Sequence, residues 1–186
     1  MFDDICNYLT KVQDCINKLN KDEIENFVKI LIEKRNEGKQ IFIMGNGGSG
    51  STASHFSCDF NKGLSYQKDK KFKFICLNDN IPTILAYSND ISYDDIFVEQ
   101  LKNFLNKDDL VIGISSSGNS KNVLKAIEYA NKNNATTFAL TGYDGGKLRQ
   151  IANHSINTNI DDVQISEDIH IMLFHLAYKV IEKTLK

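Results

Sequence analysis

The chain has 186 residues, of which 41% are hydrophobic and 25% charged, a composition typical of one globular domain with its own core. Its 22 basic and 24 acidic residues give a net charge of −2. It therefore lacks the basic excess of a general nucleic-acid binder, and we expect no nucleic-acid partner. No apolar run approaches the roughly 18–20 residues that span a bilayer, and the start does not resemble a secretory signal. Four scattered cysteines without a CxxC pair are typical of reduced thiols. We expect a soluble cytoplasmic protein with no membrane partner.

Residues 1 to about 37 have the apolar periodicity of helices. Apolar side chains recur at spacings of three and four, first between Ile5 and Leu19 and again between Ile24 and Ile32. Gly38 stands where a helix would stop. Such a pair of helices must bury its apolar faces. We therefore expect residues 1–38 to cover the sheet or to pack against another subunit.

From residue 40 onward, short apolar runs alternate with helix-compatible segments. We predict strands at 40–44, 72–77, 110–114, 136–141 and 155–158, and helices at 51–61, 82–87, 94–105, 121–133 and 164–184. This alternation predicts an α/β fold, a doubly wound three-layer parallel sheet with helices on both faces. Because no repeat, linker or low-complexity stretch interrupts it, we treat residues 1–186 as a single domain.

A glycine-rich loop follows the first predicted strand. Gly45, Gly47 and Gly50 satisfy the G-x-G-x-x-G fingerprint of dinucleotide-binding domains. That fingerprint also expects an acidic residue about 20 positions on, whereas the nearest acid at the end of the second strand is Asp79, nearly thirty positions on. The loop is therefore open to two interpretations: a nicotinamide-nucleotide site, or a turn that needs glycines for its tight geometry.

A serine-rich loop follows the third predicted strand. Four hydroxyls stand between that strand and the next helix, on Ser115, Ser116, Ser117 and Ser120. The amino end of a helix attracts anions through its free N–H groups and its dipole. Only two arginines occur in the chain, so clustered guanidinium groups cannot bind a phosphate here. The loop predicts an anion site built from hydroxyls and backbone N–H groups.

Two helical segments carry the residues that could perform acid–base or metal chemistry. His55 and Asp59 stand four positions apart and hence on one helix face, where they could ligate a metal, share a proton or form only a surface pair. The closing helix carries Glu167, His170 and His175 among apolar residues. A histidine there could be either a core residue or a ligand.

Taken together, these motifs resemble one family. The resemblance rests on Gly45–Ser49, His55 with the acid at 59, Ser88-Asn89-Asp90, Gly113–Ser120, Leu140–Gly146 and Ile169–His175. In this combination the chain is similar, over nearly its whole length, to the sedoheptulose-7-phosphate isomerases (phosphoheptose isomerases) of the SIS, or sugar isomerase, superfamily. The resemblance implies an SIS-type fold, a sugar phosphate substrate and a homotetramer with sites at subunit interfaces.

The resemblance also implies roles for particular residues. It implies one zinc ion per subunit, with His55, Asp59, Glu167 and His175 as ligands, and it implies Asp59 as the catalytic base and His175 as the acid. The family usually has Glu at the position of Asp59 and Gln at that of Glu167. The substrate would be bound by Asn46, Gly47, Gly48, Ser49, Asp59, Asn89, Asp90, Ser115, Ser116, Ser117, Ser120 and Glu167.

The implied reaction converts sedoheptulose 7-phosphate into D-glycero-D-manno-heptose 7-phosphate through an enediolate, the first step of heptose synthesis for lipopolysaccharide or capsule. Two alternatives stay open. One is a non-catalytic SIS protein that binds a replication initiator, although that branch lacks a histidine equivalent to His175. The other is an SIS isomerase that acts on a different phosphosugar.

Overall fold

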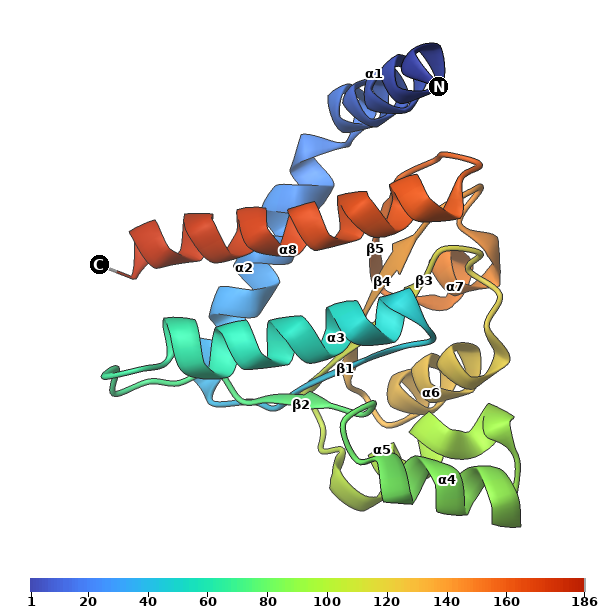
Figure 1. The fold of residues 1–186 in the computed structure, drawn as a ribbon. Coiled ribbons are helices and arrows are strands. Elements are labelled where there is room, and N and C mark those ends of the chain that lie inside the picture. The colour runs from blue at the N-terminus through green and yellow to red at the C-terminus, as the bar shows by residue number, and fades with distance from the viewer. Residues whose placement is uncertain (186) are drawn as a thin grey trace.

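The structure, a computed structural model that describes residues 1–185, is built on a five-stranded parallel sheet (Figure 1). The strands lie in the order β2-β1-β3-β4-β5, and every neighbouring pair is parallel. In chain order they are β1 (Ile41–Gly45), β2 (Phe74–Cys76), β3 (Leu110–Ser115), β4 (Thr136–Thr141) and β5 (His154–Asn157). The predicted doubly wound parallel sheet is confirmed.

Helices account for most of the remaining chain. They are α1 (Phe2–Lys18), α2 (Lys21–Glu37), α3 (Gly48–Cys58), the π-helix η1 (Asp59–Leu64), α4 (Ile81–Asp90), the 3-10 helix η2 (Tyr93–Asp95), α5 (Ile96–Phe104), α6 (Lys121–Lys132), α7 (Gly146–Ile151) and α8 (Val163–Thr184). Within residues 1–185, none of these helices combines the length and the hydropathy needed to cross a bilayer.

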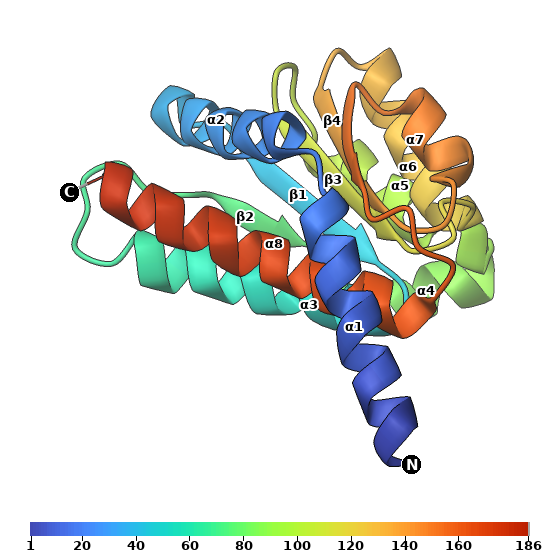
Figure 2. The same cartoon turned by 90° about the horizontal axis from the view of Figure 1, so that it is seen from above.

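The helices form one layer on each face of the sheet (Figure 2). On one face α2, α3 and α8 contribute the aromatic core residues Phe27, Phe56 and Phe174, of which Phe27 packs against Phe138 of β4 and Phe174 joins the other two. On the other face α5, α6 and α7 pack against a second apolar set that includes Phe42 of β1. Because both faces are covered, β1 and β3 are buried along their whole length, as continuous apolar runs predict.

The N-terminal segment forms two helices, as predicted. The Asn20 side chain accepts hydrogen bonds from the first turn of α2, and Gly38 ends that helix with a φ of 69°. Helix α1 projects from the body (Figure 2) and exposes apolar side chains. The hydroxyl of Tyr8 donates a hydrogen bond to Asp168 of α8 at 2.5 Å. This contact ties α1 to the helix that carries His175.

Several predicted boundaries differ from the structure: the helix predicted at 82–87 extends over Ile81–Asp90, and α7 was not predicted. Helix α3 begins at Gly48 rather than at Ser51, so part of the glycine loop is already helical. Gly47, whose φ is 54°, makes the preceding turn, a conformation that favours glycine. The predicted strand at 72–77 is paired as a strand only over Phe74–Cys76. At the other end of α3 the chain continues into a π-helix, which the apolar pattern did not predict.

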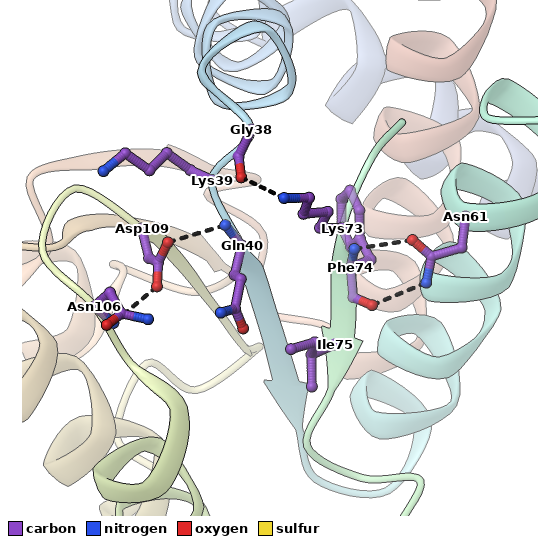
Figure 3. Close-up of a pocket in the computed structure, with 9 residues that line it drawn as sticks. All are labelled: Gly38, Lys39, Gln40, Asn61, Lys73, Phe74, Ile75, Asn106 and Asp109. Atoms are coloured by element: carbon purple, nitrogen blue, oxygen red, sulfur yellow. Dashed lines mark hydrogen bonds between the residues drawn. The ribbon is translucent and has the colours of Figure 1, made fainter. Parts of the chain in front are cut away.

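The amino ends of β1, β2 and β3 surround a hollow of about 480 Å³ (Figure 3). Its polar side chains bind the main chain. Asp109 accepts hydrogen bonds from the backbone N–H groups of Gln40 and Asn106 at 2.9 and 2.8 Å. Asn61 bonds both the N–H and the carbonyl of Phe74, and Lys73 donates to the carbonyl of Gly38. These contacts hold the strand ends together.

Candidate active site

The loops that carry the predicted site residues meet at the carboxyl ends of the strands. Strands β1 and β3 are neighbours in the sheet. The chain leaves β1 for α3 on one face and leaves β3 for α6 on the other. Ligands of open α/β sheets bind at such a point, where successive crossovers diverge. The fold therefore brings the glycine loop and the serine loop to one crevice.

The serine loop has the features of an anion site. The hydroxyl of Ser115 lies 3.0 Å from that of Ser120 and 3.4 Å from that of Ser117. Ser120 is the residue that precedes α6, and its side chain makes no capping hydrogen bond. The buried hydroxyl of Ser116 has no hydrogen-bond partner. Because buried polar groups are normally paired, this loop keeps donors available for a ligand.

The glycine loop contributes both backbone and side-chain groups. Asn46 is half-buried and exchanges two hydrogen bonds with Asn122, at 2.9 and 2.8 Å. Gly47 and Gly48 are exposed, whereas the side chain of Ser49 is buried in the first turn of α3. Gly47 and Gly48 therefore expose backbone groups to the crevice, whereas Ser49 exposes none.

Asn89 and Asp90 end helix α4, and both are exposed. Their side chains bond each other, with Asn89 donating to Asp90 at 2.8 Å. The nearby Tyr93 reaches the glycine loop, because its hydroxyl donates to Asn46 at 2.9 Å. Tyr93 and Asn122 were missed by the sequence analysis. No local motif marks either residue, and only the folded chain brings them to Asn46.

Three of the four predicted metal ligands lie together. Nε2 of His55 is 3.2 Å from Oδ2 of Asp59, and Nε2 of His175 is 3.8 Å from the same oxygen. Potential ligand atoms of these three residues all lie within 4.8 Å of one another. His55 comes from α3, Asp59 begins the π-helix and His175 comes from α8. Two nitrogens and one carboxylate oxygen suit zinc and leave a coordination position open.

An aromatic platform supports this cluster. Phe56 and Phe174 are fully buried and stack with ring centroids 4.1 Å apart. The ring of His55 stacks on Phe56, and the ring of His175 meets Phe56 edge-on. The two histidines are themselves about half exposed. Phe56 thus packs against both imidazole rings, and both rings remain accessible to solvent.

Glu167 lies outside the three-residue group, among the described residues. Its carboxylate lies so close against Gly48 that a methyl group on Gly48 would overlap it. Both residues line a cavity of about 280 Å³ between α3 and α8, and His55 lines it as well. The cavity connects the glycine loop to His55. The role of Glu167 as a fourth ligand stays a prediction.

The two histidines of α8 have different environments. His170 is buried, and its Nε2 lies 3.2 Å from the carbonyl oxygen of Thr141. Burial lowers its pKa to about 4, against a smaller opposing effect of that hydrogen bond. The neutral ring must therefore donate from Nε2, and its buried Nδ1 has no partner. His170 is a core residue, while His175 belongs to the site.

The comparisons with known proteins agree with this geometry. Residues 6–142 match the family model described as "SIS domain". The chain is therefore an SIS-domain protein, the class that the fold and the serine loop define.

Individual relatives of the chain define its family within the class of SIS-domain proteins. A phosphoheptose isomerase of Helicobacter pylori is 37% identical over 164 residues, which cover 88% of this chain and 84% of the relative. A probable phosphoheptose isomerase of Thermoplasma volcanium is 32% identical over 179 residues, which cover 96% and 91%. A solved phosphoheptose isomerase of Francisella tularensis superposes with a TM-score of 0.89, at 26% identity and 98% coverage of both chains. The chain belongs to the phosphoheptose isomerase family.

Proposed function

We propose that this protein is an isomerase that converts sedoheptulose 7-phosphate into D-glycero-D-manno-heptose 7-phosphate. One observation carries the proposal: a carboxylate and an imidazole, on Asp59 and His175, lie 3.8 Å apart, in a chain whose serine loop holds a buried hydroxyl without a partner. Membership of the phosphoheptose isomerase family supports the same substrate. The alternative of a non-catalytic binding protein has no comparable support.

The reaction needs a base, an acid and a means of stabilising an oxyanion. In our proposal the serine loop and the amino end of α6 bind the phosphate. Asp59 removes a proton from C1 of the ketose, and electrons flow to the carbonyl oxygen to give an enediolate. His175 supplies the proton that this oxygen needs. The hydroxyl on C1 then gives its proton back to His175 as the C1 carbonyl forms, and Asp59 returns its proton to C2 to complete the aldose. Asn46, Gly47, Gly48, Asn89 and Asp90 bind the sugar between these two ends.

We also propose that the cluster of His55, Asp59 and His175 holds one zinc ion per subunit, with Glu167 as a fourth ligand. The donor set fits, since imidazole and carboxylate are ordinary zinc ligands. When bound, zinc would polarise the carbonyl oxygen of the substrate as a Lewis acid. Ser49, Ser115, Ser116, Ser117 and Ser120 complete the proposed substrate contacts.

The assembly and the cellular role are part of the proposal. Helix α1 exposes Phe2, Ile5 and Leu9 on its surface, which supports residues 1–38 as the contact that joins copies into a homotetramer. We propose that residues 1–186 form one domain. We further propose that the enzyme acts in the cytoplasm, where its product enters heptose synthesis for lipopolysaccharide or capsule.

The test is incubation of the purified protein with sedoheptulose 7-phosphate, with and without a zinc chelator, followed by NMR of the products. We expect the heptose 7-phosphate to form, chelation to abolish its formation and added zinc to restore it. Absence of product from the zinc-loaded protein would refute the proposed reaction. Full activity after complete removal of the metal, verified by elemental analysis, would refute only the role of zinc.

A further inference from the structure

Three side chains from separate parts of the chain form one hydrogen-bonded network beside the glycine loop. Asn46 follows β1, Asn122 is the second residue of α6 and Tyr93 begins η2. Asn46 and Asn122 exchange two hydrogen bonds, and the Tyr93 hydroxyl bonds Oδ1 of Asn46 at 2.9 Å. Asn122 is almost fully buried, Asn46 is half-buried and Tyr93 is exposed. The network therefore leads from the core to the surface of the crevice.

The orientation of every group in this network follows from one backbone N–H. The N–H of Val123 donates to Oδ1 of Asn122 at 2.9 Å, and a backbone N–H can only donate. Oδ1 of Asn122 is thereby identified, so Asn46 must approach it with Nδ2. Oδ1 of Asn46 then faces Nδ2 of Asn122 and the Tyr93 hydroxyl, which must donate to it. One Nδ2 hydrogen of Asn46 is left without a partner in the network.

Tyr93 is itself held in place from α6. Ser92 caps η2 by accepting from the N–H of Asp94, and its hydroxyl donates to Asp95. Asp95 pairs with Lys125 of α6 at 2.8 and 3.0 Å, and this contact lowers the pKa of the Asp95 carboxyl. The segment after Asn89 and Asp90 is thus fastened to the helix that follows the serine loop.

We infer that Tyr93 and Asn122 are positioning residues that fix the Asn46 amide so that its remaining N–H points to the bound sugar. The inference rests on the proposed function and deepens it. Through this network the glycine loop, the segment after α4 and the start of α6 are held at fixed separations. A donor that is already oriented loses less entropy when the substrate binds. Neither residue touches the reacting atoms in this scheme, so their effect reaches the substrate through Asn46.

The kinetic test uses Tyr93→Phe, which removes only the hydroxyl. Loss of one hydrogen bond of ordinary strength corresponds to roughly a fivefold change in an equilibrium. We therefore expect about a fivefold rise in KM for sedoheptulose 7-phosphate with kcat changed less than twofold. Tyr66→Phe removes the hydroxyl of another exposed tyrosine, outside the network, and serves as the matched control, with no expected change. An unchanged KM in Tyr93→Phe would overturn the inference.

A double-mutant comparison separates positioning from direct contact. In an Asn46→Ala background, Tyr93→Phe should raise KM no further, because its only route to the substrate is gone. A fivefold rise that persists in that background would overturn the inference, since Tyr93 would then act on the substrate itself. Asn122→Ala should raise KM more than Tyr93→Phe does, since it removes both of the bonds to Asn46. Equal KM values for Asn122→Ala and the wild type would also overturn it.

An NMR measurement decides the inference without any turnover. The side-chain NH₂ signals of Asn46, identified by their loss in Asn46→Ala, should shift in Tyr93→Phe and stay in place in Tyr66→Phe. Unchanged Asn46 signals in Tyr93→Phe would show that the hydroxyl does not hold the amide. If the wild type fails to isomerise sedoheptulose 7-phosphate, the proposed function fails, while this measurement still tests the network.

Discussion

The two ends of the sheet use polar side chains in opposite ways. At the amino ends of β1, β2 and β3, Asp109, Asn61 and Lys73 bind backbone groups of neighbouring segments. At the carboxyl ends, the serine hydroxyls bond mainly each other, and the buried Ser116 hydroxyl has no partner. Both ends are polar and both are hollowed.

The difference shows how a binding end can be distinguished from a structural end in one fold. A buried polar group without a partner costs about 1–3 kcal/mol. At the carboxyl ends a bound ligand can supply the missing hydrogen bond. At the amino ends the side chains already supply it to the backbone groups. The comparison predicts that substitutions at the carboxyl ends change activity with little loss of stability, and that those at the amino ends do the reverse.

The largest effect is expected from the proposed base and acid. Asp59→Asn and His175→Ala should each lower kcat by about 10³-fold, within the usual range for an acid–base group. Both side chains are partly exposed, so the melting temperature of the metal-free protein should change little. Steady-state isomerase kinetics and calorimetry measure the two quantities. Asp69→Asn, an exposed acid near the amino ends, is the control, and full activity in both site variants would remove the catalytic assignment.

His170 is an exception at the carboxyl ends, because its buried ring bonds the main chain as the side chains at the amino ends do. Its pKa is lowered to about 4 in the folded protein, against about 6.5 in an unfolded chain. Between these values the unfolded state binds the proton more tightly, so acidification favours unfolding. Stability should be complete above pH 6.5 and should fall by roughly 3 kcal/mol as the pH drops to 4.

The measurement is urea unfolding at a series of pH values, with His170→Gln as the comparison. The variant should lose the part of the pH dependence that His170 contributes, so its curve should be flatter between pH 6.5 and 4. Parallel curves for the two proteins would show that the ring titrates normally in the folded state, and would contradict its buried environment.

Asp109, at the amino ends, should affect stability and leave activity unchanged, in contrast to Asp59 and His175. Its two oxygens accept from two backbone N–H groups, and Asp109→Asn replaces one acceptor with a donor. We expect a loss of about 2 kcal/mol in the free energy of unfolding, with kcat and KM of the folded protein unchanged. Asp108→Asn is a neighbouring control, since the side chain of Asp108 forms an exposed ion pair with Lys39 and its substitution should cost under about 0.5 kcal/mol. A loss of activity in folded Asp109→Asn would contradict the prediction that substitutions at the amino ends affect stability alone.

The sequence predicted the features that depend on local pattern. Short runs such as Leu110–Ile114 predicted the strands, and the ends of those runs located the loops. The spacing of His55 and Asp59 placed them on one helix face, and their contact is confirmed. That His175 joins them came only from the family resemblance, since the two helices are far apart in the chain.

Other features depend on how distant segments pack. The π-helix that begins at Asp59 has no local signature, and neither has the contact of Glu167 with Gly48. The network of Tyr93 with Asn46 and Asn122 joins residues as far apart as 76 positions. Polar residues in loops carry no periodicity, so only the tertiary structure reveals which of them meet.

The smallest effect is expected at the serine loop. Ser117→Ala removes one hydroxyl that lies 3.4 Å from Ser115 and accepts weakly from the N–H of Asn119 at 3.2 Å. Because Ser117 is exposed, its loss should leave the melting temperature unchanged. The phosphate should lose about one hydrogen bond, so KM should rise roughly fivefold at constant kcat. Ser155→Ala, at a half-buried serine of the edge strand β5, is the control. A KM that stayed at its wild-type value would show that the Ser117 hydroxyl does not bind the phosphate. The proposed difference between the carboxyl ends and the amino ends of the strands would then lose its support at the serine loop.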